Sequence, residues 1–476
     1  MPSATAKLNP FENTPVFERY PSSGLDILVV GGGIAGLSFA IEACRKGHQV
    51  RIIDRRPHFE DYGDMIAIQE SVVQTLKAWP DFLDRCREGP VPTTGMVYKH
   101  TGEAVNEIKS FAISTTRAIL HNLLHQYVLH LGISVRHSAR AVEYFEDADH
   151  AGVILEGEGD HNEKIEREKL VGDVVVAADG IGSRSWNLVL GKKEQPISSG
   201  FAMVRSTYPL ERALANPVMA ASWCHGNEAR MLYGPGAHMV TARAGDRMIF
   251  MLTHKDNETS VEDWAKPTDP KVALPYVQGW VPWVHEMIKA APDEGTVDYK
   301  LMWRNPREKW CSPGGRVIQI GDAAHTFLPT SASGATMAME DGYSLATCLQ
   351  LGGKSNAPLA VRVHNKLRFE RVTCAQKMGF KTREKLHHAD LDPSPNTSPD
   401  SSSVLTGALV GDWVLRHDPE QYAYEMYGRC ANHLLTGAPF ENSNYPPGHT
   451  FKLWTVQEML AVADRHESIQ DDGDWK

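Results

Sequence analysis

The 476-residue sequence lacks several features that mark other classes of protein. It has no run of about 18 apolar residues and no basic-then-apolar N-terminal pattern, so we expect neither a transmembrane helix nor a signal peptide. Its net charge of -10 argues against a nucleic-acid-binding surface. The 7 cysteines are scattered without a C-x-x-C pair, so we expect reduced thiols in a cytoplasmic compartment and no disulfide framework.

Two further absences narrow the enzyme classes. The 21 histidines show neither an H-E-x-x-H pattern nor clustered ligand spacing, which argues against a metal centre. No G-x-S-x-G elbow is present, so the sequence does not support an α/β-hydrolase. The hydrophobic fraction of 42% is typical of a globular protein, and the length allows two or more structural units.

The most informative stretch runs from residue 25 to residue 54, LDILVVGGGIAGLSFAIEACRKGHQVRIID. Asp26 to Val30 is an apolar run typical of a parallel strand that is buried on both faces. Gly31, Gly33 and Gly36 follow at G-x-G-x-x-G spacing. The first glycine allows a tight turn, the second lets a pyrophosphate approach the backbone, and the third lets the next helix pack closely.

A helix and a second strand complete this unit. The helix is expected from about Ile34 to Lys46, and its free N–H groups would face phosphates. Val50 to Ile53 forms the strand, and Asp54 at its end is placed to accept hydrogen bonds from a ribose diol. The pattern therefore predicts dinucleotide binding, with an ordinary strand-to-helix turn as the alternative.

Arg117 lies in the first turn of a second predicted helix, which Ser114 or Thr115 can cap. The helix dipole disfavours a cation at that place, so the guanidinium would need an anion or a polar ligand. A solvated surface arginine is the alternative.

Two later strands also end in polar loops. The run from Asp173 to Ala177 leads into Asp179 and Gly180, at the kind of strand end where α/β sheets bind ligands. A second buried strand ends at Asp322, which suits a hydroxyl-rich ligand chain, and a helix opens near Gly334 and Ala335. The alternative in both places is a simple turn.

The sequence predicts an α/β fold, with a Rossmann-like nucleotide-binding domain, an inserted and mainly antiparallel β-sheet substrate domain, and a helical C-terminal region. Regularly spaced strands from about residue 200 to 301 predict the inserted sheet. Residues 1–23 are expected to form a loose arm. The expected units are 24–199 (with segments near 90–113 belonging to the substrate domain), 200–311, 312–380, and 381–476 as linker and C-terminal helices.

Three motifs stand in order along the chain: GGGIAG with its acid, AADGIGSRS, and GDAAHTFLP followed by GATMAMEDG. Together they resemble the single-component FAD-dependent aromatic hydroxylases, the flavoprotein monooxygenases of the p-hydroxybenzoate and salicylate hydroxylase type. The residues of the last motif are most similar to those of fungal members that act on polyketides or other secondary metabolites. The resemblance covers roughly residues 24 to 380.

The resemblance implies a role for each motif. The three glycines, Asp54 and Arg117 would hold the ADP half of FAD, and Asp322 would hold the ribityl chain. Asp179 and Gly180 would serve both the flavin pyrophosphate and a passing NADPH or NADH. The residues expected near the flavin ring are Gly63, Ala67, Gly334 and Ala335.

The same resemblance suggests two catalytic residues. A stretch like G-x-x-x-x-R ends at Arg205, and a Tyr-Gly-Pro-Gly stretch begins at Tyr233. In several fungal members, an arginine and a tyrosine at these places position a phenolate substrate. An arginine stabilises the anion and a tyrosine hydroxyl orients it. The alternatives are an arginine in a surface ion pair and a tyrosine in the core.

The sequence departs from the family pattern at three places. Trp186 stands where the Asp-Gly motif usually ends in arginine, and Arg184 is the candidate substitute. Ala332 replaces a glycine after the proline turn, beside Ser333, and Met65 replaces another glycine. The flavin carries the oxygen chemistry, so none of these changes removes a group that this chemistry needs.

The resulting hypothesis is an FAD-dependent monooxygenase. NADPH or NADH would reduce FAD, O₂ would add to give a flavin C4a-hydroperoxide, and the distal oxygen would pass to an aromatic or polyketide-type small molecule. Hydroxylation, epoxidation and dearomatisation all remain open, and a homodimer is expected by analogy alone. The alternatives are an NAD(P)-dependent dehydrogenase and a non-catalytic flavin-binding protein.

Overall fold

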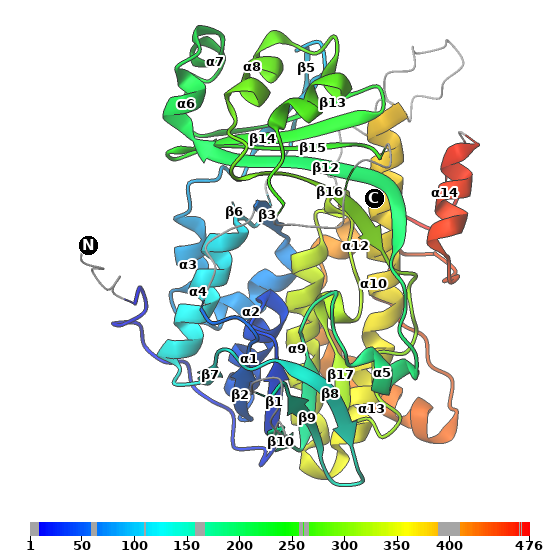
Figure 1. The fold of residues 1–476 in the computed structure, drawn as a ribbon. Coiled ribbons are helices and arrows are strands. Elements are labelled where there is room, and N and C mark those ends of the chain that lie inside the picture. The colour runs from blue at the N-terminus through cyan, green and yellow to red at the C-terminus, as the bar shows by residue number, and fades with distance from the viewer. Residues whose placement is uncertain are drawn as a thin grey trace, which may run out of the picture.

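The computed structural model describes residues 9–58, 64–108, 111–157, 167–256, 260, 266–388, 410–465, 467 and 469–476. A parallel sheet with its helices forms one part of the molecule, and a larger mixed sheet lies across it (Figure 1). This arrangement confirms the predicted α/β fold class. Among the described residues, no helix combines the length and apolar character needed to cross a membrane.

The parallel sheet has the strand order β17-β11-β1-β2-β7. Its strands are β1 (Asp26–Val30), β2 (Gln49–Ile53), β7 (Ser134–Arg136), β11 (Val174–Ala177) and β17 (Val317–Gln319). The central strand β1 is buried on both faces, as its apolar run predicts, because Ile27 and Val29 face one core cluster while Leu28 and Val30 face another.

Helices cover one face of this sheet, and a small antiparallel sheet covers the other. Helix α1 (Ile34–Arg45) packs against α9 (Gly334–Gly352), and Gly342 allows the close approach, since an added Cβ there would lie 2.9 Å from the backbone nitrogen of Phe39. The opposite face meets β8 (Ala141–Glu146) and β9 (Ala151–Leu155). Strand β9 pairs with β8 on one side and with β10 (Lys169–Gly172) on the other.

The larger sheet has the order β16-β12-β15-β14-β13-β4-β5. Its strands are β4 (Gly95–Lys99), β5 (Ala104–Ile108), β12 (Ile197–Pro209), β13 (Glu228–Gly234), β14 (Ala237–Ala244), β15 (Arg247–Lys255) and β16 (Thr296–Trp303). Neighbouring strands are antiparallel, as expected, except that β4 runs parallel to β13. One face is covered by α6 (Leu210–Leu214), α7 (Pro217–Ser222) and α8 (Pro282–Ala290), which Figure 1 shows at the top.

The uncovered face of the larger sheet looks toward the parallel-sheet part across a two-stranded ribbon, β3 (Met65–Ile68) and β6 (Ile113–Thr116). Helix α4 (Arg117–His130) follows β6 directly. Its cap is Thr116, whose hydroxyl accepts from the backbone of Ile119, so the predicted cap at Ser114 or Thr115 is wrong. Those two residues belong to the strand.

The remaining helices are α2 (Val73–Lys77), α3 (Phe82–Arg87), α5 (Trp186–Leu190), α10 (Ala357–His388), α12 (Asp412–Leu415), α13 (Pro419–Thr436) and α14 (Val456–Asp464). The long α10 runs along the molecule and reaches the larger sheet, as Figure 1 shows in yellow.

The N-terminal segment is not a loose arm over its described part. Phe11 is fully buried, 4.8 Å from the ring of Tyr127 and 6.0 Å from that of Phe82. The expectation is wrong there because one aromatic side chain, Phe11, binds the segment to the core, although the residues around it in the sequence are mostly polar.

Candidate active site

A cavity of about 400 Å³ lies at the carboxyl ends of β1, β2 and β11 and beside the turn after β17. We call it the polar cavity. Seven of the residues that the sequence predicts to bind a cofactor line it: Gly31, Gly33, Asp54, Arg117, Asp179, Gly180 and Asp322. They come from four separate stretches of the chain, so the fold brings the residues of the separate motifs together at one edge of the sheet.

The glycine turn shows why each glycine is needed. Gly31 has a φ of +111°, and a Cβ added to it would lie 2.3 Å from the carbonyl oxygen of Ala178. A Cβ on Gly36 would lie 2.0 Å from the carbonyl oxygen of Gly31, so this glycine supports the turn from behind the cavity wall. Gly33 has open space around it and leaves the first amides of α1 without a side-chain cap.

Two side chains hold this turn. The Oδ2 atom of Asp54 accepts a hydrogen bond from the backbone of Gly32 at 2.7 Å, and Oδ1 accepts from the backbone of Arg56 at 2.8 Å. On the other side, His121 Nε2 donates to the carbonyl oxygen of Gly32 at 2.5 Å. Burial lowers the pKa of His121, which keeps the ring neutral.

His121 is a functional candidate that the sequence interpretation missed. It lies four residues after Arg117 on α4, and both side chains line the polar cavity. The four-residue spacing places them on one helix face, which is the signal that could have found it.

Asp179 is held in place but not fully satisfied. Tyr144 donates from its hydroxyl to Oδ2 at 2.8 Å, whereas Oδ1 is buried without a hydrogen-bond partner. Burial raises the pKa of this carboxyl group. Nearby, Arg184 lines the cavity and Trp186 is not among its lining residues, which suits the substitution proposed for the missing family arginine.

The side chain of Asp322 is exposed to the polar cavity, although protein atoms surround the cavity there. Its carboxylate faces the cavity, and burial among protein atoms raises its pKa. The turn that carries it is fixed by Asp341, whose Oδ2 accepts from the backbone of Gly321 at 3.0 Å and from His325 Nε2 at 2.6 Å. A carboxylate presented in this way can accept hydrogen bonds from a hydroxyl-rich ligand.

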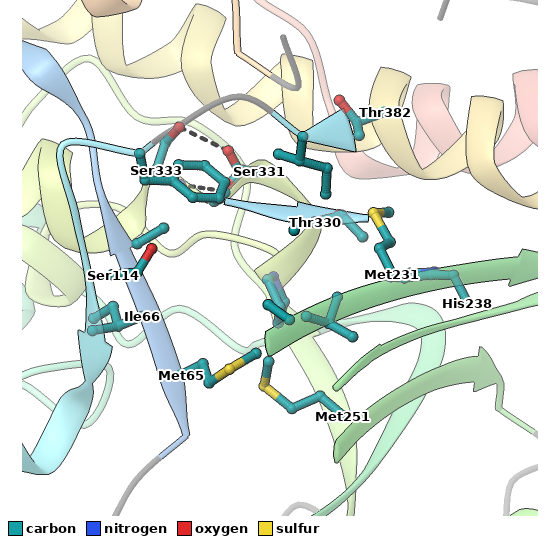
Figure 2. A pocket seen from close by; sticks show the side chains of 18 of the residues that line it. Met65, Ile66, Ser114, Met231, His238, Met251, Thr330, Ser331, Ser333 and Thr382 are labelled. Atoms are coloured by element: carbon teal, nitrogen blue, oxygen red, sulfur yellow. Dashed lines mark hydrogen bonds between the residues drawn. The ribbon is translucent and has the colours of Figure 1, made fainter. Parts of the chain in front are cut away.

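A second cavity of about 290 Å³ lies under the uncovered face of the larger sheet; we call it the apolar cavity. Figure 2 shows Met65, Met231 and Met251 around this space. Three residues expected near a flavin ring line it, namely Ala67, Gly334 and Ala335. The fourth, Gly63, lies outside the described residues.

The loop before α9 also closes on this cavity. Ala332 lines it in a left-handed conformation with a φ of +47°, at the place where the family has glycine. The local backbone thus keeps a glycine-like shape without a glycine. Ser333 fixes the loop by donating from its hydroxyl to the carbonyl oxygen of Ser331 at 2.8 Å.

The two predicted catalytic residues lie apart on the larger sheet. Arg205 on β12 is 8% exposed, lines the polar cavity and donates from Nη1 to Asp64 Oδ1 at 2.9 Å. Tyr233 on β13 is 2% exposed and is not among the residues that line either cavity. Strands β15 and β14 separate them, so their backbones are roughly 14 Å apart across the sheet.

Asp64 is the second functional candidate missed by the sequence interpretation. Its side chain lines the polar cavity, and the next residue, Met65, lines the apolar cavity. Burial raises the pKa of Asp64, while its partner Arg205 opposes that shift. The Asp64–Arg205 ion pair therefore stands beside the boundary between the two cavities.

The donor set of the polar cavity fits FAD. Backbone amides of a glycine turn and several arginines suit a pyrophosphate, and Asp54 and Asp322 suit the hydroxyl groups of a ribose and a ribityl chain. No group of three or more potential metal ligands is found among the described residues. The site thus has the composition of a dinucleotide site beside an apolar chamber.

Known proteins share this architecture. Residues 24–358 match the family model described as the FAD binding domain, so the chain belongs to the FAD-binding-domain family of flavoproteins. Its curated relatives include the FAD-dependent monooxygenase fsr3 of Gibberella fujikuroi, 36% identical over 96% of this chain and 90% of the relative. The FAD-dependent monooxygenase dmxR9 of Cryptosporiopsis sp. is 38% identical over 96% of this chain and 91% of its own.

Solved structures agree with the family. The complex of CtdE with FAD and a substrate has a TM-score of 0.78 at 27% identity, and covers 86% of this chain and 100% of that one. A salicylate hydroxylase substrate complex has a TM-score of 0.67 at 21% identity, covering 86% of this chain and 98% of that one, which extends the likeness in fold.

Proposed function

We propose that this protein is an FAD-dependent monooxygenase that takes electrons from NADPH or NADH and uses O₂ to oxygenate an aromatic or polyketide-type small molecule. One observation carries the proposal: consecutive residues, Asp64 and Met65, line the polar and the apolar cavity. A cofactor in the first would therefore meet a substrate in the second. The names of the fungal relatives support the same activity.

Bound FAD would supply the electron transfer and the oxygen activation. The protein's part is to hold the cofactor, with the glycine turn and Arg117 at the ADP half and Asp322 at the ribityl chain. The apolar cavity, walled largely by methionine and other apolar side chains, would keep water from the reacting atoms. Arg184 would receive the nicotinamide cofactor at the outer part of the polar cavity.

Arg205 is our candidate for the polar group at the meeting point of cofactor and substrate. Its same-face neighbours, Met203 along β12 and Met251 across on β15, both line the apolar cavity. Arg205 thus stands at the edge of the substrate chamber, with its charge balanced by Asp64. Tyr233 lines neither cavity, so it would act on the substrate through its pairing partner in the sheet, His238.

A dehydrogenase that shares only the glycine motif is less well supported. Such an enzyme has no need for Asp179 and Asp322 beside the glycine turn, yet both line the same cavity here.

The non-catalytic alternative rested on Trp186 and Ala332. Arg184 lines the polar cavity, and the backbone of Ala332 keeps the left-handed shape expected of the family glycine.

Arg205→Met is expected to keep FAD and lose product. The ADP-binding turn is untouched, whereas loss of a buried charged hydrogen-bond donor should lower product formation by about 100-fold or more. Flavin absorbance, NADPH consumption and product would be measured with whichever member of a panel of phenols and naphthols the natural protein oxygenates. Arg247→Met, an exposed arginine on the same sheet, is the matched control and should behave as the natural protein. Full product formation by Arg205→Met would contradict a role for Arg205 in the reaction.

A further inference from the structure

The register of the larger sheet places residues in rows across its uncovered face. One row runs from Met203 on β12 to Thr253 on β15, His238 on β14 and Tyr233 on β13, because each is the pairing partner of the next. The first three of these residues line the apolar cavity. The neighbouring row, two residues along each strand, is Arg205, Met251, Val240 and Met231.

Thr253 is a buried polar group without a partner in the protein. The residue is 1% exposed, lines the apolar cavity, and its Oγ1 makes no hydrogen bond. A buried hydroxyl left unsatisfied is costly, and a native structure seldom keeps one without a reason. A ligand oxygen in the cavity would satisfy it.

His238, the pairing partner of Thr253, also faces this cavity, and Figure 2 shows it beside Met231. Burial, together with the charge on Arg383, lowers the pKa of His238 to about 3. The ring is therefore neutral and is far too weak a base to hold a proton taken from a phenol, whose pKa is about 10. It can still donate or accept a hydrogen bond.

The surroundings of this pair are apolar. Met203, Met231, Val240 and Met251 lie beside it on the sheet face, and Phe327 lines the cavity from the loop before α9. Methionine side chains adapt to flat rings and make favourable contacts with them. Thr253 and His238 are therefore neighbouring polar groups in a cavity wall that is otherwise apolar and can pack against an aromatic ring.

We propose that Thr253 and His238 bind a hydroxyl or carbonyl oxygen on the substrate, and thereby select aromatic compounds that carry such an oxygen on the ring edge facing β14 and β15. The inference rests on the proposed function, since it assigns the apolar cavity to the substrate. It gives the substrate two polar contacts of different kinds: a neutral pair on the sheet and the charged Arg205 at the boundary with the cofactor. The substrate is held at Thr253 and His238 without losing a proton there.

The test compares ligands that differ by one hydroxyl group. Binding of 2-naphthol against naphthalene, and of p-cresol against toluene, would be measured calorimetrically on the FAD-loaded protein. The natural protein should bind the hydroxylated member of at least one pair about tenfold more tightly. Thr253→Val and His238→Leu should each reduce this preference by about threefold or more, with the flavin spectrum retained.

Thr241→Val is the matched control. Thr241 is also a buried threonine of the sheet, but it donates to the carbonyl oxygen of Ile249 at 2.6 Å and contacts Met287 on the helix-covered face. Its replacement should leave the preference unchanged.

Two results would overturn the inference: no hydroxylated compound binding more tightly than its parent, or a preference that survives both cavity variants. Flavin content separates this failure from that of the proposed function. A protein that holds FAD and oxidises NADPH but lacks the preference contradicts only the inference. A protein that cannot take up FAD contradicts both.

Discussion

Gly33→Ala is expected to weaken FAD binding by about 100-fold while leaving the apoprotein as stable as before. An added Cβ at Gly33 meets no atom within 4 Å, and its φ of -81° is open to alanine, so the fold has room for it. A pyrophosphate must approach the backbone at this glycine, and the methyl group would block that approach. Loss of one or two hydrogen bonds to a charged group, about 1.5–3 kcal/mol each, accounts for the change.

Gly36→Ala provides the contrast. Its Cβ would lie 2.0 Å from the carbonyl oxygen of Gly31, so the turn itself must move, and both FAD binding and the melting temperature of the apoprotein should fall. Thermal unfolding of the apoproteins and FAD titration would be measured on the two variants side by side. Normal FAD affinity in Gly33→Ala would show that the phosphates do not lie against this turn.

Glu340→Ala is expected to destabilise the protein by about 3–5 kcal/mol, because it removes the carboxylate that binds the buried Arg371 and one of the two carboxylates that bind the buried Arg368. Glu340 is fully buried, and its oxygens accept from Arg371 at 2.8 Å, from Arg368, and from the Ser71 hydroxyl at 2.7 Å. Burial alone would raise the pKa of Glu340, but the two arginines outweigh it and hold the pKa well below its usual range.

The pH dependence of this contribution follows from the direction of the shift. Because the folded-state pKa of Glu340 is depressed, its stabilising contribution is present above the unfolded-state pKa of about 4.3 and is lost as the pH falls below that value. Denaturant unfolding at pH 7 would measure the main effect, with the exposed Glu425→Ala on α13 as a control that should change stability by less than about 0.5 kcal/mol. A change below about 1 kcal/mol in Glu340→Ala would contradict the role assigned to this network.

The local part of the site could be predicted from the sequence. The turn from β1 to α1 depends on glycines a few residues apart, and Asp179 and Asp322 each follow a buried strand directly. Short-range rules are sufficient where the chain forms a strand, a turn and a helix in succession. The predicted strands of the larger sheet were also confirmed. They could be predicted because successive residues of a strand alternate between the two faces of the sheet, which leaves a pattern in the sequence.

The parts that depend on distant contacts could not be predicted. His121 reaches Gly32 across 89 residues, and Asp64 meets Arg205 across 141. The position of Thr253 under the apolar cavity follows from strand pairing, which a single strand does not reveal. The parallel pairing of β4 with β13 likewise joins segments more than a hundred residues apart, and nothing in either segment specifies its partner.

The absorption spectrum of the purified protein, before and after NADPH is added under nitrogen, tests the central claim most directly. We expect the bands of oxidised flavin, present on purification or after incubation with FAD, and their bleaching by NADPH alone or once a phenolic compound is added. Admission of air should then restore the spectrum and yield an oxygenated product. A protein that stays colourless after incubation with FAD would contradict the assignment and return attention to a dehydrogenase.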